Sequence, residues 1–119
     1  MSGMRIYVAG PYTPKTDNVH DAPRIAHQNV RKAIAAALKL MKKGHYPFVP
    51  HLSHFMHLEN DEPTESSYWV DYDLKWLEVC DAILLLPGWE RSSGARREYE
   101  AAKKLGLKIY FSVDEVPDA

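Results

Sequence analysis

Residues 81–105 constrain the fold of this chain more than any other stretch, because they combine the patterns of a strand, a loop and a helix. The first part, residues 82–86, is a continuous apolar run that Pro87 and Gly88 end. Strands that are covered on both faces have this pattern, and such strands belong to parallel sheets. The stretch therefore predicts an α/β protein.

A helix from about residue 94 to residue 105 is predicted to follow this strand. Ser92 or Ser93 can cap its start, and Gly106 can end it. Glu98 falls on the apolar stripe of the helix, one turn from the start. The helix dipole and the free amides are expected to keep this inward carboxylate ionised, so that it could act as a nucleophile.

The rest of the chain alternates in the same way between strand and helix patterns. Asp21 is the expected cap of the first helix. This alternation predicts one Rossmann-like α/β domain over residues 1–119, with a parallel sheet of about four strands in the flavodoxin-like order 2-1-3-4, flanked by helices. Besides the elements above, strands are expected at 5–9, 46–49 and 107–111, helices at 22–43 and 66–79, and a frayed acidic tail at 112–119.

Composition excludes several classes of protein. A chain of 119 residues with 45% hydrophobic residues and a net charge of −1 has no basic excess for nucleic-acid binding. Cys80 is the single cysteine, so neither a disulfide nor a cysteine cluster for zinc is expected. No apolar run approaches the roughly 18 residues of a membrane span, and the N-terminus does not have the pattern of a signal peptide. A cytoplasmic protein is the expectation.

Three histidines, His51, His54 and His57, follow the second predicted strand at a spacing of three. On a helix, the first and the last diverge by about 240° of rotation, so the three cannot meet one ion. A plainer interpretation is that His51, just past the end of a strand, lines a pocket. We therefore expect no metal site.

Asp73 has an unusual neighbourhood in the third predicted helix. Trp69 and Trp76 lie one turn away on either side, and Cys80 continues the same stripe. A carboxyl group against apolar rings has its pKa raised, which suits a general acid at neutral pH. An equally good interpretation is a structural aspartate that pairs with an arginine or accepts a hydrogen bond from a loop.

These side chains converge if the predicted strand order is correct. Ligands of such sheets bind beyond the carboxyl ends of strands one and three, where the order reverses. Tyr7, Glu98 and Asp73 would then share one cleft. Two carboxylates beside one cleft suit glycosyl transfer, in which one attacks the anomeric carbon and the other protonates the leaving group.

Three stretches also carry a resemblance to a known family: RIYVAG at 5–10, YDLKWLEVCDAILLL at 72–86 and SSGARREYEAAKKLGLKI at 92–109. The sequence resembles the nucleoside 2-deoxyribosyltransferase superfamily, and most closely its 2'-deoxynucleoside 5'-phosphate N-hydrolase branch. The resemblance implies that the enzyme acts on a small-molecule nucleotide, without a cofactor, as a homodimer or higher homo-oligomer.

The resemblance also assigns roles. Glu98 matches the family's catalytic glutamate, Asp73 the carboxylate that serves the leaving base, and Tyr7 the tyrosine that orients the nucleophile. Ser92 stands where the N-hydrolases bind the 5'-phosphate and the nucleoside transferases carry an aspartate; a helix cap is its other interpretation. The candidate substrate-binding residues are Gly10, Pro11, Tyr12, His51, Trp89, Ser92, Ser93 and Gly94.

The sequence thus predicts N-glycosidic cleavage of a (deoxy)nucleoside 5'-monophosphate through a glutamate nucleophile. Two alternatives stay open: a nucleoside 2-deoxyribosyltransferase that moves the sugar between bases, and a nucleotide-binding or sensor domain without turnover.

Overall fold

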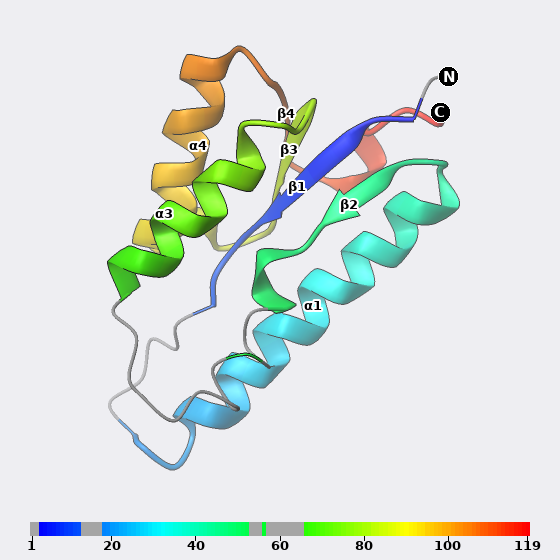
Figure 1. Ribbon diagram of the computed structural model, residues 1–119. Coiled ribbons are helices and arrows are strands. Elements are labelled where there is room, and N and C mark those ends of the chain that lie inside the picture. The colour runs from blue at the N-terminus through cyan, green and yellow to red at the C-terminus, as the bar shows by residue number, and fades with distance from the viewer. Residues whose placement is uncertain (1–2, 13–17, 53–55, 57–65) are drawn as a thin grey trace.

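The buried strands of the chain form a parallel sheet at the centre of the fold. The computed structural model describes residues 3–12, 18–52, 56 and 66–119, and in this part the sheet has four strands in the order β2-β1-β3-β4. The predicted α/β class, strand direction and strand order are confirmed (Figure 1). The strands are β1 (Arg5–Ala9), β2 (Tyr46–Phe48), β3 (Ala82–Leu85) and β4 (Lys108–Tyr110).

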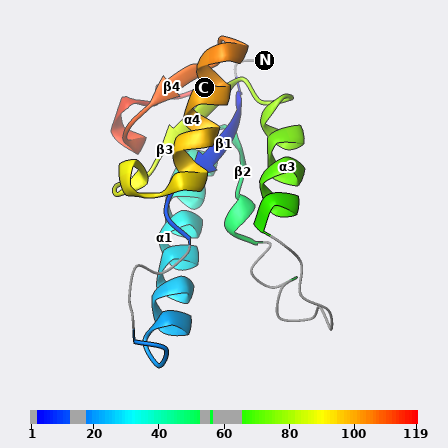
Figure 2. The same ribbon diagram turned by 90° about the vertical axis from the view of Figure 1, so that its left-hand side faces the viewer.

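Helices cover both faces of the sheet. Helix α1 (Ala22–Lys42) covers one face, and α3 (Ser66–Leu77) and α4 (Ser93–Leu105) cover the other (Figures 1 and 2). Because successive side chains of a strand point to opposite faces, Ile6 of β1 packs on the α1 side and Tyr7 on the other. The predicted elements are confirmed apart from one or two residues at their ends.

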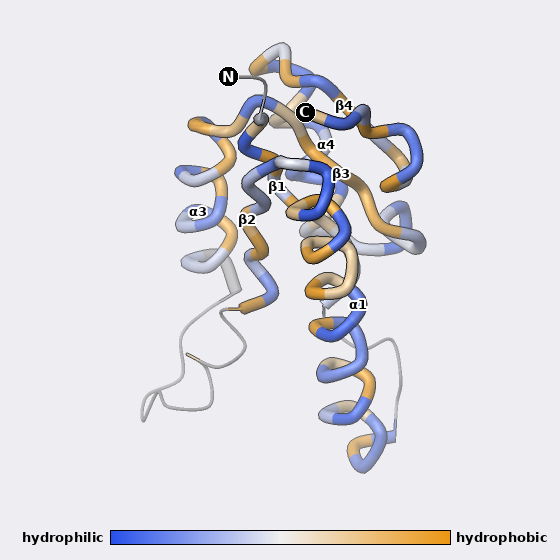
Figure 3. The backbone as a smooth tube through the Cα atoms, turned by 90° about the vertical axis from the view of Figure 1, so that its right-hand side faces the viewer, coloured by the Kyte–Doolittle hydropathy of each residue, from blue (hydrophilic) through white to orange (hydrophobic). Residues whose placement is uncertain are grey.

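Helix α1 is much longer than the strands on which it packs. Its N-terminal half extends past the carboxyl ends of the strands, so it borders the edge where ligands of such sheets bind (Figures 2 and 3). Asp21 occupies the N-cap position, but its side chain makes no capping hydrogen bond, so this detail of the prediction is wrong. Instead, Asp21 pairs with Arg24 at 3.5 Å in an exposed position.

The expected frayed tail at residues 112–119 is ordered, and that prediction is wrong. Val116 is 1% exposed and belongs to the core on the α1 side. Its carbonyl accepts a hydrogen bond from Lys43 Nζ at 2.7 Å, and His45 Nε2 donates to the Pro117 carbonyl at 2.6 Å. One apolar side chain in an acidic segment therefore fixes the tail to the end of α1, beside the N-terminus (Figure 1).

Within the described ranges, the search for a helix both long and apolar enough to span a bilayer finds none.

Candidate active site

Glu98 is positioned by the start of α4. Ser92, in an extended conformation, is the N-cap, and its Oγ accepts a hydrogen bond from the Ala95 amide at 3.2 Å. Gly106 ends the helix with a φ of +74°, a left-handed conformation that favours glycine. Both predicted caps are confirmed, and they set the rotation of α4 that turns Glu98 toward the sheet.

Tyr7 of β1 meets Glu98 across the interior. Its side chain is fully buried, and its hydroxyl donates a hydrogen bond to Glu98 Oε2. Burial raises the pKa of Tyr7 well above its usual value, and the charges of Glu98 and Asp73 raise it further. Tyr7 therefore stays protonated and acts as a fixed donor to one oxygen of the carboxyl group.

Asp73 of α3 lies on the same side of the sheet as Glu98. Burial raises its pKa to about 7, which is the direction that its two tryptophan neighbours predict. Its Oδ1 is buried without a hydrogen-bond partner, and no ion pair of Asp73 is found in the described part of the chain. The interpretation of a structural aspartate held by an arginine or a loop therefore has no contact to support it there.

The expectation that Glu98 is ionised is wrong for the ligand-free chain. Burial raises its pKa to about 8; the hydrogen bond from Tyr7 acts in the opposite direction, and the charge of Asp73 adds to the increase. Loss of water around the carboxylate thus outweighs the helix dipole. Between about pH 7 and 8, the two carboxyl groups hold about one proton between them, and the higher pKa of Glu98 keeps most of it there.

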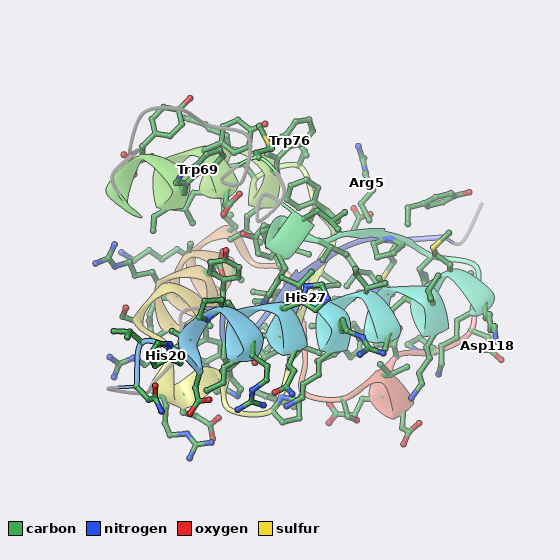
Figure 4. The ribbon with its side chains drawn as sticks, turned by 90° about the horizontal axis from the view of Figure 1, so that it is seen from below. Arg5, His20, His27, Trp69, Trp76 and Asp118 are labelled. Atoms are coloured by element: carbon green, nitrogen blue, oxygen red, sulfur yellow. The ribbon has the colours of Figure 1, made fainter. Side chains whose placement is uncertain are left out.

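A row of aromatic side chains connects Tyr7 with α3 on this side of the sheet. Phe48 of β2 lies 5.6 Å from Tyr7 and stacks on Trp76 at 5.3 Å between ring centroids. Trp76 remains 45% exposed. In Figure 4, seen from below, Trp69 and Trp76 lie on α3, away from His27 of α1 and from His20, which precedes that helix.

The turn after β1 is packed closely against the end of β3. A Cβ atom on Gly10 would lie 2.8 Å from the Cβ of Leu86, so only glycine fits without displacing the neighbour. The amide group of Asn29 on α1 donates to the Tyr12 carbonyl at 3.1 Å. The turn is therefore held between α1 and β3.

His51 holds the same turn from the β2 side. It is 4% exposed, and its Nε2 lies 3.0 Å from the Pro11 carbonyl, to which it donates. Its ring also meets Tyr12 edge-on at 6.2 Å. Burial lowers the pKa of His51, so it positions the turn as a neutral side chain.

His54 and His57, the other two histidines of the predicted cluster, lie outside the described residues. Among the side chains that are described, no group of three or more His, Cys, Asp or Glu could hold a metal ion.

A cavity of about 570 Å³ opens at the carboxyl ends of β1 and β3, on the α1 side. Pro11 and Ser92, both predicted as binding residues, line it. Sequence reasoning missed Asn29 and Lys32 of α1, which also line it. The signal was present, because Ile25, Asn29 and Lys32 follow helical spacing and form one stripe.

The other predicted binding residues lie outside the lining of this cavity. The ring of Trp89 packs on Tyr99 at 4.8 Å and on Phe111 at 6.0 Å. Ser93 is exposed at the first turn of α4. A Cβ atom on Gly94 would meet nothing within 4 Å in the described structure, so packing alone does not require glycine there.

The comparisons with known proteins match a family model and several solved structures. The family described as "Domain of unknown function (DUF1937)" matches residues 4–113. A structure titled "2-desoxiribosyltransferase from Leishmania mexicana" is 24% identical, with a TM-score of 0.49. The match covers 88% of this chain and 61% of that chain, so this chain spans less than two thirds of its length. No curated protein matches the sequence. Neither match assigns a function.

Proposed function

The chain belongs to the DUF1937 family, a family of domains of unknown function, and we propose that it cleaves the N-glycosidic bond of a (deoxy)nucleoside 5'-monophosphate and releases the base. The observation that carries this proposal is the buried hydrogen bond from Tyr7 to Glu98, with the Asp73 carboxyl group close enough to change the pKa of Glu98. Two carboxyl groups of different environment beside one sugar are the requirement of a retaining glycosidase.

In the proposed reaction, an ionised Glu98 attacks C1' of the sugar and the bond to the base breaks. Asp73, protonated in the productive form, donates its proton to the departing base. Water then attacks C1' of the glycosyl-enzyme, gives a proton to Asp73 and releases the sugar phosphate. Tyr7 keeps Glu98 Oε2 in place throughout. The proposal requires no metal and no organic cofactor.

Ser92 is the proposed contact for the 5'-phosphate. Its Oγ uses a lone pair to accept from the Ala95 amide, which leaves its hydroxyl proton free to donate to a phosphate oxygen. The helix N-terminus adds amide donors and a favourable dipole. Six residues of helix separate Ser92 from Glu98, a rise of about 9 Å, which a nucleoside monophosphate can bridge.

One observation favours an enzyme over a binding domain without turnover. Neither Glu98 nor Asp73 is in an ion pair with any other described residue, so both are available to a ligand. A transferase would use the same two groups and differ only in the acceptor, which would be a second base instead of water.

The test is a panel of nucleoside 5'-monophosphates and nucleosides, with the released base measured by chromatography. We expect base release from monophosphates, and a loss of at least about a thousandfold in kcat for Glu98→Gln. Glu100→Gln is the matched control, because Glu100 is an exposed carboxylate of the same helix. Adding a free second base separates the two reactions, since only a transferase makes a new nucleotide. Equal rates of base release for Glu98→Gln and the control would refute the role of Glu98 as the nucleophile.

A further inference from the structure

The cavity on the α1 side, which neither Glu98 nor Asp73 lines, has a charged wall to which the proposed reaction assigns no role. Lys32 of α1 and Arg91 of the 3-10 turn η2 (Trp89–Arg91) both line it, and among the described lining residues none is acidic. Within the described residues, no ion pair of either cation is found. Two cations facing one cavity without a counter-charge favour an anionic occupant.

The position of the Arg91 head group follows from its neighbour Gly88. A Cβ atom on Gly88 would lie 3.6 Å from Arg91 Nη2 and 3.2 Å from Pro11 Cγ. The guanidinium therefore lies over the backbone of Gly88, beside the turn after β1. Gly88 also has a φ of +89°, which side chains rarely adopt, so the backbone favours glycine where the guanidinium needs the space.

Lys32 reaches the cavity from the other wall. It is on the part of α1 that also presents Ile25 and Asn29 to the cavity. Asn29 is already occupied, because its amide donates to the Tyr12 carbonyl. Lys32 is therefore the charged side chain that α1 contributes, and it faces Arg91 and Ser92 across a space of about 570 Å³.

We propose that Lys32 and Arg91 determine the specificity of the site for phosphorylated substrates by binding the phosphate dianion from the two walls of this cavity. Arg91 presents a planar fork that matches two phosphate oxygens, and Lys32 presents a compact charge to the third. Two positive charges match the dianion. This inference rests on the proposed function, since it names which groups recognise the phosphate of the same substrate.

The test is direct binding without turnover. In a Glu98→Ala background, calorimetry compares the four common 2'-deoxynucleoside 5'-monophosphates with the corresponding nucleosides. Lys32→Ala and Arg91→Ala are each expected to weaken monophosphate binding by about tenfold or more at physiological salt and to leave nucleoside binding unchanged. The matched control is Arg31→Ala, which removes one charge from an exposed neighbouring position of α1 that does not line the cavity.

The outcomes separate this inference from the proposed function. Suppose that monophosphate binding depends on Lys32 but the intact protein releases no base. This result would support the phosphate-binding role of Lys32 and Arg91 and refute the proposed reaction. Base release by the intact protein with equal monophosphate affinity for Lys32→Ala and Arg31→Ala would do the reverse. If the Glu98→Ala protein binds monophosphates no better than nucleosides, the proposed phosphate binding by Lys32 and Arg91 is wrong.

Discussion

At the carboxyl ends of the strands, the two faces of the sheet differ in the charged groups that they present and in how deeply these groups are buried. On the α3–α4 side, Glu98 and Asp73 lie partly buried among aromatic rings, and burial raises the pKa of both. On the α1 side, Lys32 and Arg91 are exposed around an open cavity. One side is built to hold a proton, and the other presents positive charge to solvent.

Strand β1 and the turn after it contribute to both sides. Tyr7 of β1 points to the α3–α4 side and holds Glu98, whereas the turn that follows β1 places Pro11 at the cavity on the α1 side. Under the proposed function, a substrate bridges the two sides, with Ser92 at the junction.

The largest change in substrate preference is expected from Ser92→Asp. An added carboxylate at phosphate-contact distance repels the dianion by several kcal/mol at an effective dielectric near 20, so monophosphate activity should fall by roughly a hundredfold or more. The same carboxylate can accept a hydrogen bond from the 5'-hydroxyl of a nucleoside, so nucleoside activity should be kept or increased. Both kcat/KM values are measured on each protein.

Ser92→Ala and a stability measurement are the controls for this prediction. Alanine removes one donor and leaves the amides of α4 in place, so its effect on monophosphate activity should be milder. Aspartate caps a helix as well as serine, so Ser92→Asp should fold normally. An unchanged preference in a folded Ser92→Asp protein would leave Ser92 as a cap alone.

The fold could be predicted because its signals are local. The apolar run of β3, the helical spacing of α1 and α4, and glycine at two helix ends each follow from a few neighbouring residues. Strand order then follows from the alternation of strands and helices. The order of the tail at 112–119 could not be predicted because it depends on contacts with residues far away in the sequence: Val113 and Val116 pack on the core of the α1 side, and Lys43 and His45 hold the tail's carbonyl groups.

The site could be predicted in part, for a similar reason. Tyr7, Asp73 and Glu98 could be placed on one side of the sheet from topology alone. The protonation of Glu98 could not, because desolvation depends on everything that packs around the carboxyl group. The role of Lys32 in lining the cavity could not be predicted either, since the cavity forms only when the turns after β1 and β3 come together.

The value of kcat/KM should have a bell-shaped dependence on pH, because the productive form carries one proton on the pair of Glu98 and Asp73. Below about 7, both groups carry a proton and Glu98 cannot attack; above about 8, both are ionised and no proton remains for the departing base. Between these values the pair holds one proton, mostly on Glu98, and the productive form is the minor arrangement with that proton on Asp73. kcat/KM should therefore peak between these values and fall by about tenfold per pH unit beyond them. Asp73→Asn should lose the falling limb. A flat profile from pH 5 to 9 would contradict the shared proton.

The last expected effect is on the free energy of unfolding, and it concerns Glu98 alone. The pKa of Glu98 rises from its usual 4.5 to about 8 on folding. Between these values the unfolded chain binds fewer protons than the folded one, so this group lowers stability as pH rises. Gln mimics the protonated acid and keeps an acceptor for Tyr7. Glu98→Gln should thus match the natural protein near pH 4 and exceed its unfolding free energy by about 4 kcal/mol at pH 8. Urea unfolding at both pH values measures this difference. Glu100→Gln should show no such divergence, and an equal gain for both variants would mean that surface charge, not burial of Glu98, sets the pH dependence.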